Sequence, residues 1–208
     1  MEETNTLTAH TTPPVSRKKK PSALGEILSL SIIALIVVFP IRYFIAQPFI
    51  VSGSSMDPTF HDGQYLIVDQ LTYRFETPKR SDVVVFKYPK DPSKYFIKRV
   101  IGLPGDTLTI DGNIVTVKNA QNEQGFVLSE PYVSHMQPNT TLTETLGNHE
   151  YFVMGDNRDA SSDSRVWGIL RDDLIIGRTF VRLFPVADAS FMPGSLDKFT
   201  GSNVQKTE

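Results

Sequence analysis

The sequence predicts a mainly β protein, in which an antiparallel β-sheet domain follows one N-terminal transmembrane helix. Three observations lead to this fold class. Residues 27–46 are apolar apart from a few small polar residues and one charge, Arg42. Beyond residue 48, short runs of β-branched and aromatic residues alternate with turns rich in Gly, Pro and Asp. In that same region no long segment shows the apolar period of an amphipathic helix.

Composition narrows the class of protein before any motif is considered. A chain of 208 residues has room for one or two domains. Its formal net charge of −2 leaves no basic excess to neutralise phosphates, so we expect no nucleic-acid partner. The absence of cysteine excludes disulfides, thiol catalysis and thiolate-bound metal. The chemistry must therefore come from oxygen and nitrogen side chains.

The N-terminal region predicts a tail and then a membrane anchor. Residues 1–22 are polar and contain the basic cluster 17–20, which is typical of a disordered cytoplasmic tail. Residues 23–47 are long enough to cross a bilayer, whereas a cleaved signal peptide has a shorter apolar core and a buried core helix is less uniformly apolar. Arg42 and Tyr43 suit the far interface. We expect one span with the N-terminus in the cytoplasm.

The rest of the chain predicts an extracytoplasmic β-rich domain over residues 48–187. Within it, residues 119–148 are polar and interrupted by proline, so they predict a loop-rich insertion. Residues 188–208 have little pattern and predict a flexible C-terminal tail. The strands are expected in the β-branched and aromatic runs 65–68, 82–86, 95–101, 107–110, 114–117 and 151–154.

Two motifs suggest nucleophilic chemistry. Ser55 lies in the Gly- and Pro-bounded segment 52–59, and Lys98 follows the apolar residues 95–97. A serine hydroxyl becomes a useful nucleophile when a neighbouring base takes its proton. A lysine can be that base if burial lowers its pKa from about 10.4. Each residue alone has a simpler interpretation, since turn serines are mostly structural and strand lysines mostly face solvent.

The two motifs gain weight from their neighbours, because together they resemble bacterial type I signal peptidase. Four blocks carry the resemblance, in order behind the apolar segment: 52–59, 79–89, 95–106 and 155–168. The resemblance implies a largely antiparallel β-domain of that type. It also implies that Ser55 rather than Ser54 is the nucleophile and that Lys98 is the general base.

The resemblance further implies a set of supporting residues. Ser161 matches the hydroxyl that hydrogen-bonds the lysine amine and orients it. Two acidic and two basic residues match positions that hold the site through ion pairs: Asp163, Arg165, Arg99 and Asp156.

The oxyanion hole is the least defined part of the predicted site. The backbone N–H of Ser55 is the natural first donor to a tetrahedral intermediate. Some family members add a serine hydroxyl two residues before the nucleophile, where this chain has Gly53. A backbone N–H at Gly53 and the hydroxyl of Ser54 both remain open as the second donor.

The expected substrate is the signal peptide of an exported preprotein. Phe49, Val51 and Ile97 match the family's shallow apolar subsites, which accept small residues in an A-x-A pattern. The expected location is a bacterial cytoplasmic membrane, with lipid as a further partner. We expect no cofactor and no metal, because the four histidines show no ligand spacing.

Two other functions remain possible from the sequence. One is a self-cleaving Ser-Lys protease related to the SOS-response repressors, which share a catalytic β-fold. The other is a catalytically inactive homologue that only binds preproteins. The presence of Ser55, Lys98 and Ser161 in one chain favours the active enzyme.

Overall fold

The computed structural model describes residues 23–40, 46–134 and 141–196, and the chain divides into two units at residues 39 and 40. Helix α1 spans Ala23–Pro40, and its side chains over residues 24–38 are exposed. Within the described ranges, no helix is both long and apolar enough to cross a membrane.

The predicted anchor, residues 23–47, has a different boundary in the structure. Residues 41–45 lie outside the described part, as does the predicted tail 1–22. Ala46 and Gln47 do not extend a helix but begin strand β1 (Ala46–Ile50). The reason is backbone pairing, since β1 lies antiparallel to β2 (Tyr65–Asp69) with Ala46 opposite Asp69.

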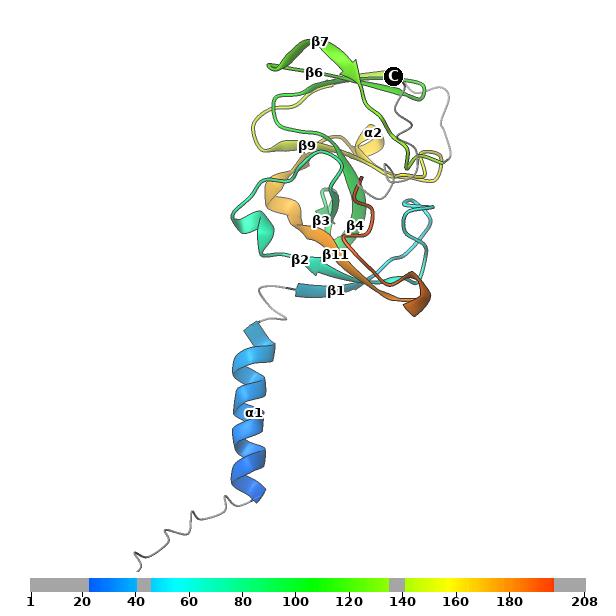
Figure 1. The fold of residues 1–208 in the computed structure, drawn as a ribbon. Coiled ribbons are helices and arrows are strands. Elements are labelled where there is room, and N and C mark those ends of the chain that lie inside the picture. The colour runs from blue at the N-terminus through cyan, green and yellow to red at the C-terminus, as the bar shows by residue number, and fades with distance from the viewer. Residues whose placement is uncertain (1–22, 41–45, 135–140, 197–208) are drawn as a thin grey trace, which may run out of the picture. The chain divides into compact units, whose positions relative to one another are not determined.

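The second unit confirms the prediction of a mainly β, antiparallel domain. It contains an eight-stranded sheet in the order β1-β2-β11-β3-β4-β9-β10, with β12 paired to β11, and a four-stranded sheet in the order β7-β6-β5-β8 (Figure 1). The further strands are β3 (Val83–Tyr88), β4 (Asp91–Gly102), β5 (Thr107–Asp111), β6 (Ile114–Asn119), β7 (Asn122–Val127), β8 (Thr141–Thr145), β9 (Glu150–Met154), β10 (Leu170–Arg171), β11 (Ile175–Phe184) and β12 (Ser190–Phe191). The helices of this unit are short: α2 (Ser164–Trp167), η2 (Thr72–Arg74), η3 (Asp172–Leu174) and η4 (Val186–Asp188).

All six predicted strand runs coincide with observed strands, namely β2, β3, β4, β5, β6 and β9. Most of their apolar side chains are buried, although Tyr95 and Ile114 are exposed. In β5 the alternation is complete, since Leu108 and Ile110 are buried while Thr109 and Asp111 are exposed. A period of two with one apolar face is what a half-buried strand requires.

Two predicted loop regions are instead folded. Residues 119–148 contain β7 and β8, the two edge strands of the four-stranded sheet, although 135–140 lie outside the described part. Edge strands often carry polar and charged side chains, which discourage pairing with another chain, and such residues conceal these strands in the sequence. The first residues of the predicted tail 188–208 are also folded. They include β12, which pairs with β11 and places Phe191 opposite Val181.

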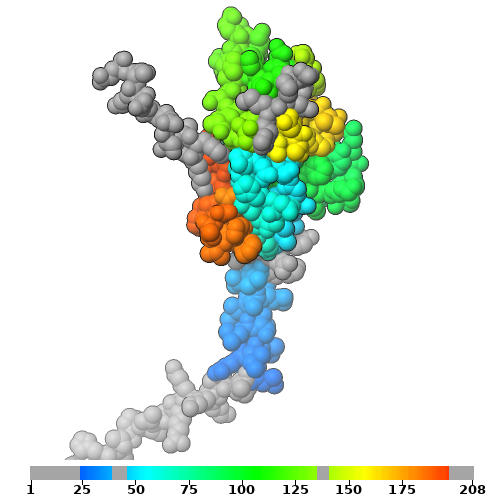
Figure 2. Space-filling view, turned by 90° about the vertical axis from the view of Figure 1, so that its right-hand side faces the viewer, coloured from blue at the N-terminus to red at the C-terminus, as the bar shows by residue number. Residues whose placement is uncertain are grey.

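Three buried clusters hold the domain together and fix the segments that carry the site. One joins β4 and β9 to the four-stranded sheet and includes Ile101, Leu108 and Phe152. A second, rich in aromatic residues, packs around Phe86 and Trp167. The third underlies the segment after β1, whose cyan surface adjoins the yellow surface of the segment after β9 in Figure 2.

Candidate active site

Ser55 lies in a compact turn that is held in place by buried side chains. After β1 the chain passes through residues 51–60, where the side chains of Met56 and Phe60 are almost completely buried in the third cluster. The amide of Phe60 donates to the carbonyl of Met56 at 2.9 Å. Gly53 adopts φ +87°, a left-handed conformation that favours glycine. Burial of the segment that directly follows Ser55 therefore limits how far its backbone can move.

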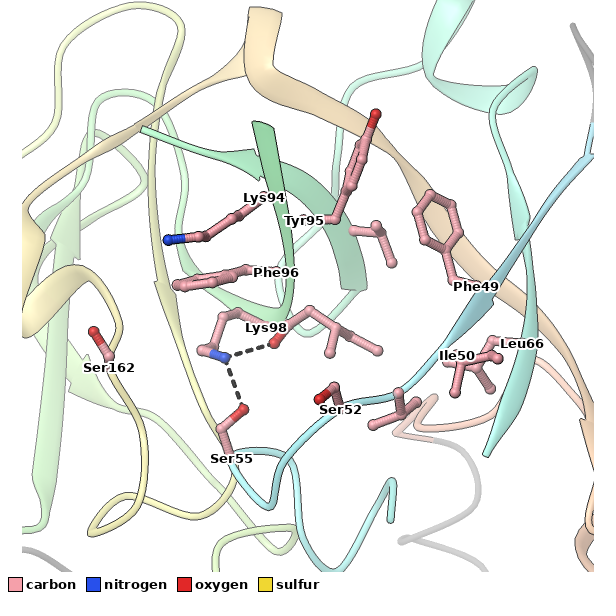
Figure 3. Close-up of a pocket in the computed structure, with 13 residues that line it drawn as sticks. Phe49, Ile50, Ser52, Ser55, Leu66, Lys94, Tyr95, Phe96, Lys98 and Ser162 are labelled. Atoms are coloured by element: carbon pink, nitrogen blue, oxygen red, sulfur yellow. Dashed lines mark hydrogen bonds between the residues drawn. The ribbon is translucent and has the colours of Figure 1, made fainter. Parts of the chain in front are cut away.

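The structure brings the two predicted reactive groups together. The amine nitrogen Nζ of Lys98, on β4, lies 2.8 Å from the hydroxyl Oγ of Ser55 and 2.8 Å from the carbonyl of Ile97 (Figure 3). The ring of Phe96 lies 5.3 Å from the same amine. These residues are 43 positions apart in sequence and meet because β4 passes the turn that holds Ser55.

Burial changes the acidity of the lysine. Lys98 is only 4% exposed. Burial disfavours the charged ammonium and lowers the pKa of Lys98 from 10.5 to about 8, although the charges of Asp163 and Asp156 act in the opposite direction. A neutral amine beside a hydroxyl is thus within reach near neutral pH, as general-base chemistry requires.

The residue after Lys98 anchors β4 in the core. The guanidinium of Arg99 is fully buried and binds Asp156 through two parallel hydrogen bonds of 2.8 and 2.6 Å. It also stacks 3.9 Å over the ring of Tyr132 and donates to the carbonyl of Gly194 at 2.6 Å. Asp156 accepts a further bond from Thr59 Oγ1 at 2.6 Å. This network joins β4, the segment after β9 and the turn of Ser55.

A second ion pair shapes the segment after β9. Arg165 binds Asp163 through Nε and Nη2, both at 2.8 Å, and the amide of Gly155 donates to the same carboxylate at 3.0 Å. Burial by itself raises the pKa of Asp163, but the hydrogen bonds and charge of Arg165 outweigh it, so the pKa lies below its ordinary value. Asp163 therefore stays ionised, with Arg165 balancing its charge.

The predicted hydrogen bond from Ser161 to Lys98 is not made. Within the described part of the chain, the buried Ser161 Oγ makes no hydrogen bond to the Lys98 amine, whose partners are Ser55 Oγ and the Ile97 carbonyl. The position is taken by the Ile97 carbonyl, which accepts from the Lys98 amine. This acceptor is a backbone carbonyl, which every residue has. A motif of residue types therefore does not indicate which carbonyl accepts from the lysine.

The structure also differs from the prediction for the backbone N–H of Gly53. That amide donates to the Asp62 carboxylate at 2.7 Å and so has no free hydrogen to offer an oxyanion. Asp62 had no role in the sequence prediction. Its position in an Asp-Gly turn is a pattern in which the carboxylate commonly accepts from backbone amides.

A largely apolar groove of about 440 Å³ includes Ser55 and Lys98 in its lining. It contains all three predicted substrate-binding residues, Phe49, Val51 and Ile97. Figure 3 shows Phe49, Ile50 and Leu66 on the side away from Lys98. The lining also includes residues that sequence reasoning did not select: Ile50, Ser52, Leu66, Val85, Lys94, Tyr95, Phe96 and Ser162.

Histidines take no part in this site in the described residues. His61 pairs with Asp57 at 2.7 Å and His149 with Asp172 at 2.6 Å, and both histidines are largely exposed. Over the same described ranges, no group of three or more His, Cys, Asp or Glu residues is placed to hold a metal ion.

The fold and the site together define a class. A serine hydroxyl in contact with a buried lysine amine, beside a largely apolar groove in an antiparallel β-domain, has the geometry that nucleophilic hydrolysis requires. Comparison with known proteins identifies the family. Residues 24–184 match the model of the family described as signal peptidase, peptidase S26.

The relatives agree with the family model over most of the chain. The Probable signal peptidase I-1 of Synechocystis sp. is 35% identical over 171 residues, which is 79% of this chain and 84% of that protein. The Signal peptidase I of Leptolyngbya laminosa is 34% identical, covering 84% of this chain and 86% of that protein. A crystal structure of a signal peptidase I from Enterococcus faecalis V583 is 28% identical, with a TM-score of 0.42, and covers 50% of this chain and 97% of that chain. From the family model and the sequence relatives, this chain belongs to the signal peptidase family, peptidase S26, and is a peptide-bond hydrolase.

Proposed function

We propose that this chain is a membrane-anchored serine endopeptidase that removes N-terminal signal peptides from preproteins. The cut follows a small residue of an A-x-A site and proceeds through an acyl-enzyme on Ser55, with Lys98 as general base. The observation that carries the proposal is the 2.8 Å contact between the Ser55 hydroxyl and an amine whose pKa burial has lowered. The relatives named as signal peptidase I supply the substrate class.

The chemistry follows from these two groups. Neutral Lys98 takes the hydroxyl proton as Ser55 Oγ bonds to the scissile carbonyl carbon, and the carbonyl oxygen becomes an oxyanion that the Ser55 N–H stabilises. The resulting ammonium then gives the proton to the leaving amine as the C–N bond breaks. Water, deprotonated by the same amine, hydrolyses the acyl ester and restores Ser55. Asp163 and Asp156, each held by an arginine, fix the surroundings of the lysine.

The groove gives a reason for the substrate class. Its apolar lining by Phe49, Val51 and Ile97 suits an extended, uncharged peptide and places that peptide next to Ser55. Small side chains at the first and third positions before the cut fit such a surface. Signal-peptide cleavage sites have that pattern.

The proposal is tested by incubating the purified protein with a preprotein and sequencing the N-terminus of the product. We expect one cut after a small residue at the end of the signal peptide. A sample without preprotein separates the rivals. Cleavage of this chain alone would favour the self-cleaving protease, and binding of preprotein without cleavage would favour the inactive homologue. Either result would contradict the proposal.

Cleavage is expected to depend on pH through Lys98. Because the neutral amine is the active form, kcat/KM should rise about tenfold per pH unit below the pKa of about 8 and level off above it. Initial rates with a peptide substrate from pH 6 to pH 10 measure the profile. A flat profile, or an optimum below neutrality, would exclude a lysine base.

Membrane attachment is part of the same proposal and rests on the N-terminal sequence. Residues 27–46 contain a single charge, and the cluster 17–20 precedes them, which favours a cytoplasmic N-terminus and an extracytoplasmic catalytic domain. The apolar side chains of α1 add support, since Leu35 and Ile36 are 67% and 65% exposed and would gain from contact with lipid.

The double substitution Ile33→Lys/Ile36→Lys is expected to move the protein from the membrane to the soluble fraction. Each lysine near the centre of an apolar helix costs roughly 3 kcal/mol of insertion free energy. Alkaline extraction of membranes, followed by immunoblotting, measures the distribution. The matched control is Ile114→Lys/Val127→Lys, which changes two exposed apolar residues of the four-stranded sheet and should leave the protein in the membrane. Equal distributions of both variants would contradict anchoring by α1.

A further inference from the structure

Asn157 touches the backbone on both sides of Ser55. Its side-chain nitrogen Nδ2 donates to the carbonyl of Ser54 at 3.2 Å, and its own backbone N–H donates to the carbonyl of Ser55 at 3.1 Å. Asn157 lies in the segment after β9, where it follows Asp156 in the sequence, and it is only 8% exposed. One residue thus holds both peptide units that flank the Cα atom of Ser55.

The geometry of a peptide unit turns this contact into a constraint on the oxyanion donor. The carbonyl of Ser54 and the N–H of Ser55 belong to the same planar, trans peptide, so they point in opposite directions. Drawing the carbonyl toward Asn157 therefore directs the N–H away from it. Among the hydrogen bonds of the described residues, the Ser55 N–H has no acceptor, so it is free to bind a substrate oxygen.

We infer that Asn157 is a positioning residue, whose side-chain amide orients the Ser54–Ser55 peptide so that the Ser55 N–H serves as the oxyanion donor. The inference rests on the proposed role of Ser55 as nucleophile. Asn157 does not touch the reacting atoms. It acts through the backbone it holds, as a preorganised oxyanion hole requires.

Removal of this amide should cost little stability, which makes the inference testable. The Ser54 carbonyl also accepts from the amide of Asp57 at 3.1 Å and keeps that partner in the variant. The amide of Ala160, which donates to Asn157 Oδ1 at 3.4 Å, lies in an exposed residue and can bind water instead. No buried polar backbone group loses its only partner, so the folded state should persist.

The test compares Asn157→Ala and Asn157→Leu with the wild-type chain on a signal-peptide substrate. The leucine variant keeps most of the side-chain volume and removes only the hydrogen bonds. We expect kcat to fall about 10- to 100-fold, less than the 10²–10³ lost with a whole oxyanion donor, because the N–H is still present but poorly aimed. KM should change less than threefold, and the midpoint of the pH profile should stay near that of Lys98.

A peptide aldehyde separates positioning from a general structural role. The aldehyde carbon bonds reversibly to a serine oxygen and forms a tetrahedral adduct, whereas the matching peptide alcohol binds without reacting. We expect affinity for the aldehyde to fall in parallel with kcat and affinity for the alcohol to be unchanged. Parallel losses for both ligands, or a large fall in melting temperature, would instead indicate a structural role and overturn the inference.

Asn119→Ala is the matched control. Its side-chain nitrogen donates to Asp106 at 3.1 Å, far along the chain and outside the groove, so its loss should leave kcat unchanged. The inference and the proposed function fail in different ways. Full activity in both Asn157 variants, with Ser55→Ala inactive, would overturn only the role of Asn157. Full activity of Ser55→Ala would overturn the proposed function.

Discussion

Ser55→Ala and Lys98→Met should each lower kcat by about 10⁴-fold or more, since each removes one half of a nucleophile–base pair. The double variant should be no slower than the single ones, because two groups that act in one step are not additive. Single-turnover cleavage of a preprotein measures the rates. If Ser54→Ala abolishes cleavage and Ser55→Ala does not, the nucleophile has been assigned to the wrong serine.

The same Lys98→Met variant is expected to be more stable than the wild-type chain at neutral pH. The pKa of Lys98 lies near 10.5 in the unfolded chain and is about 8 in the fold, so the unfolded state binds more protons between these values. The cost of burying the amine is therefore complete below pH 8 and disappears as the pH rises to 10.5. Methionine avoids a cost of roughly 3 kcal/mol at neutral pH.

Urea unfolding at pH 7 and pH 10 measures this effect. The stability gained by Lys98→Met should be largest at pH 7 and small at pH 10. Lys118→Met is the matched control, because Lys118 is exposed on β6 and its replacement should change neither activity nor the pH dependence of stability. A Lys98→Met variant that is less stable at pH 7 would show that the amine is charged and well paired in the fold.

The sequence predicts the fold where burial leaves a pattern. Leu108 and Ile110 alternate with polar residues and so identify β5, whereas β7 and β8 are edge strands with mostly exposed polar residues and no such signal. The predicted end of the anchor at residue 47 differs from the structure for a related reason. Ala46 and Gln47 are placed by pairing with β2, and pairing of distant strands is not visible in a local pattern.

The candidate site likewise has features that the sequence predicts and features that it does not. Motifs identify Ser55 and Lys98 as a pair, and the structure places their side chains in contact. Motifs do not determine which backbone groups complete the site. The carbonyl of Ile97 rather than the hydroxyl of Ser161 accepts from the lysine amine, and the Asp62 carboxylate accepts from the backbone N–H of Gly53. Such details depend on the path of the backbone, for which a matched residue type gives no information.

Gly155→Ala tests whether activity requires the close approach of the Gly155 backbone to the Ser55 backbone. A Cβ atom at position 155 would lie well inside van der Waals contact with the carbonyl oxygen of Ser55 and with the hydroxyl of Ser161. The Ser55 carbonyl belongs to a backbone held by Asn157, so it cannot move aside without displacing the hydroxyl. Because misplacement by about 1 Å can cost 10²-fold, we expect kcat to fall about 10²- to 10³-fold. Overpacking should also lower stability by about 1–3 kcal/mol.

Two companion variants separate the loss of rate from the loss of stability. Gly147→Ala is the matched control, since its Cβ would meet only the flexible end of Glu150, at 3.0 Å, and activity should be retained. Adding Ser161→Gly to Gly155→Ala removes one of the two obstructions, so melting temperature should partly recover. The rate should not recover, because the Ser55 carbonyl still blocks the new methyl group. Recovery of kcat in the double variant would place the constraint on the Ser161 side chain rather than on the backbone of the nucleophile.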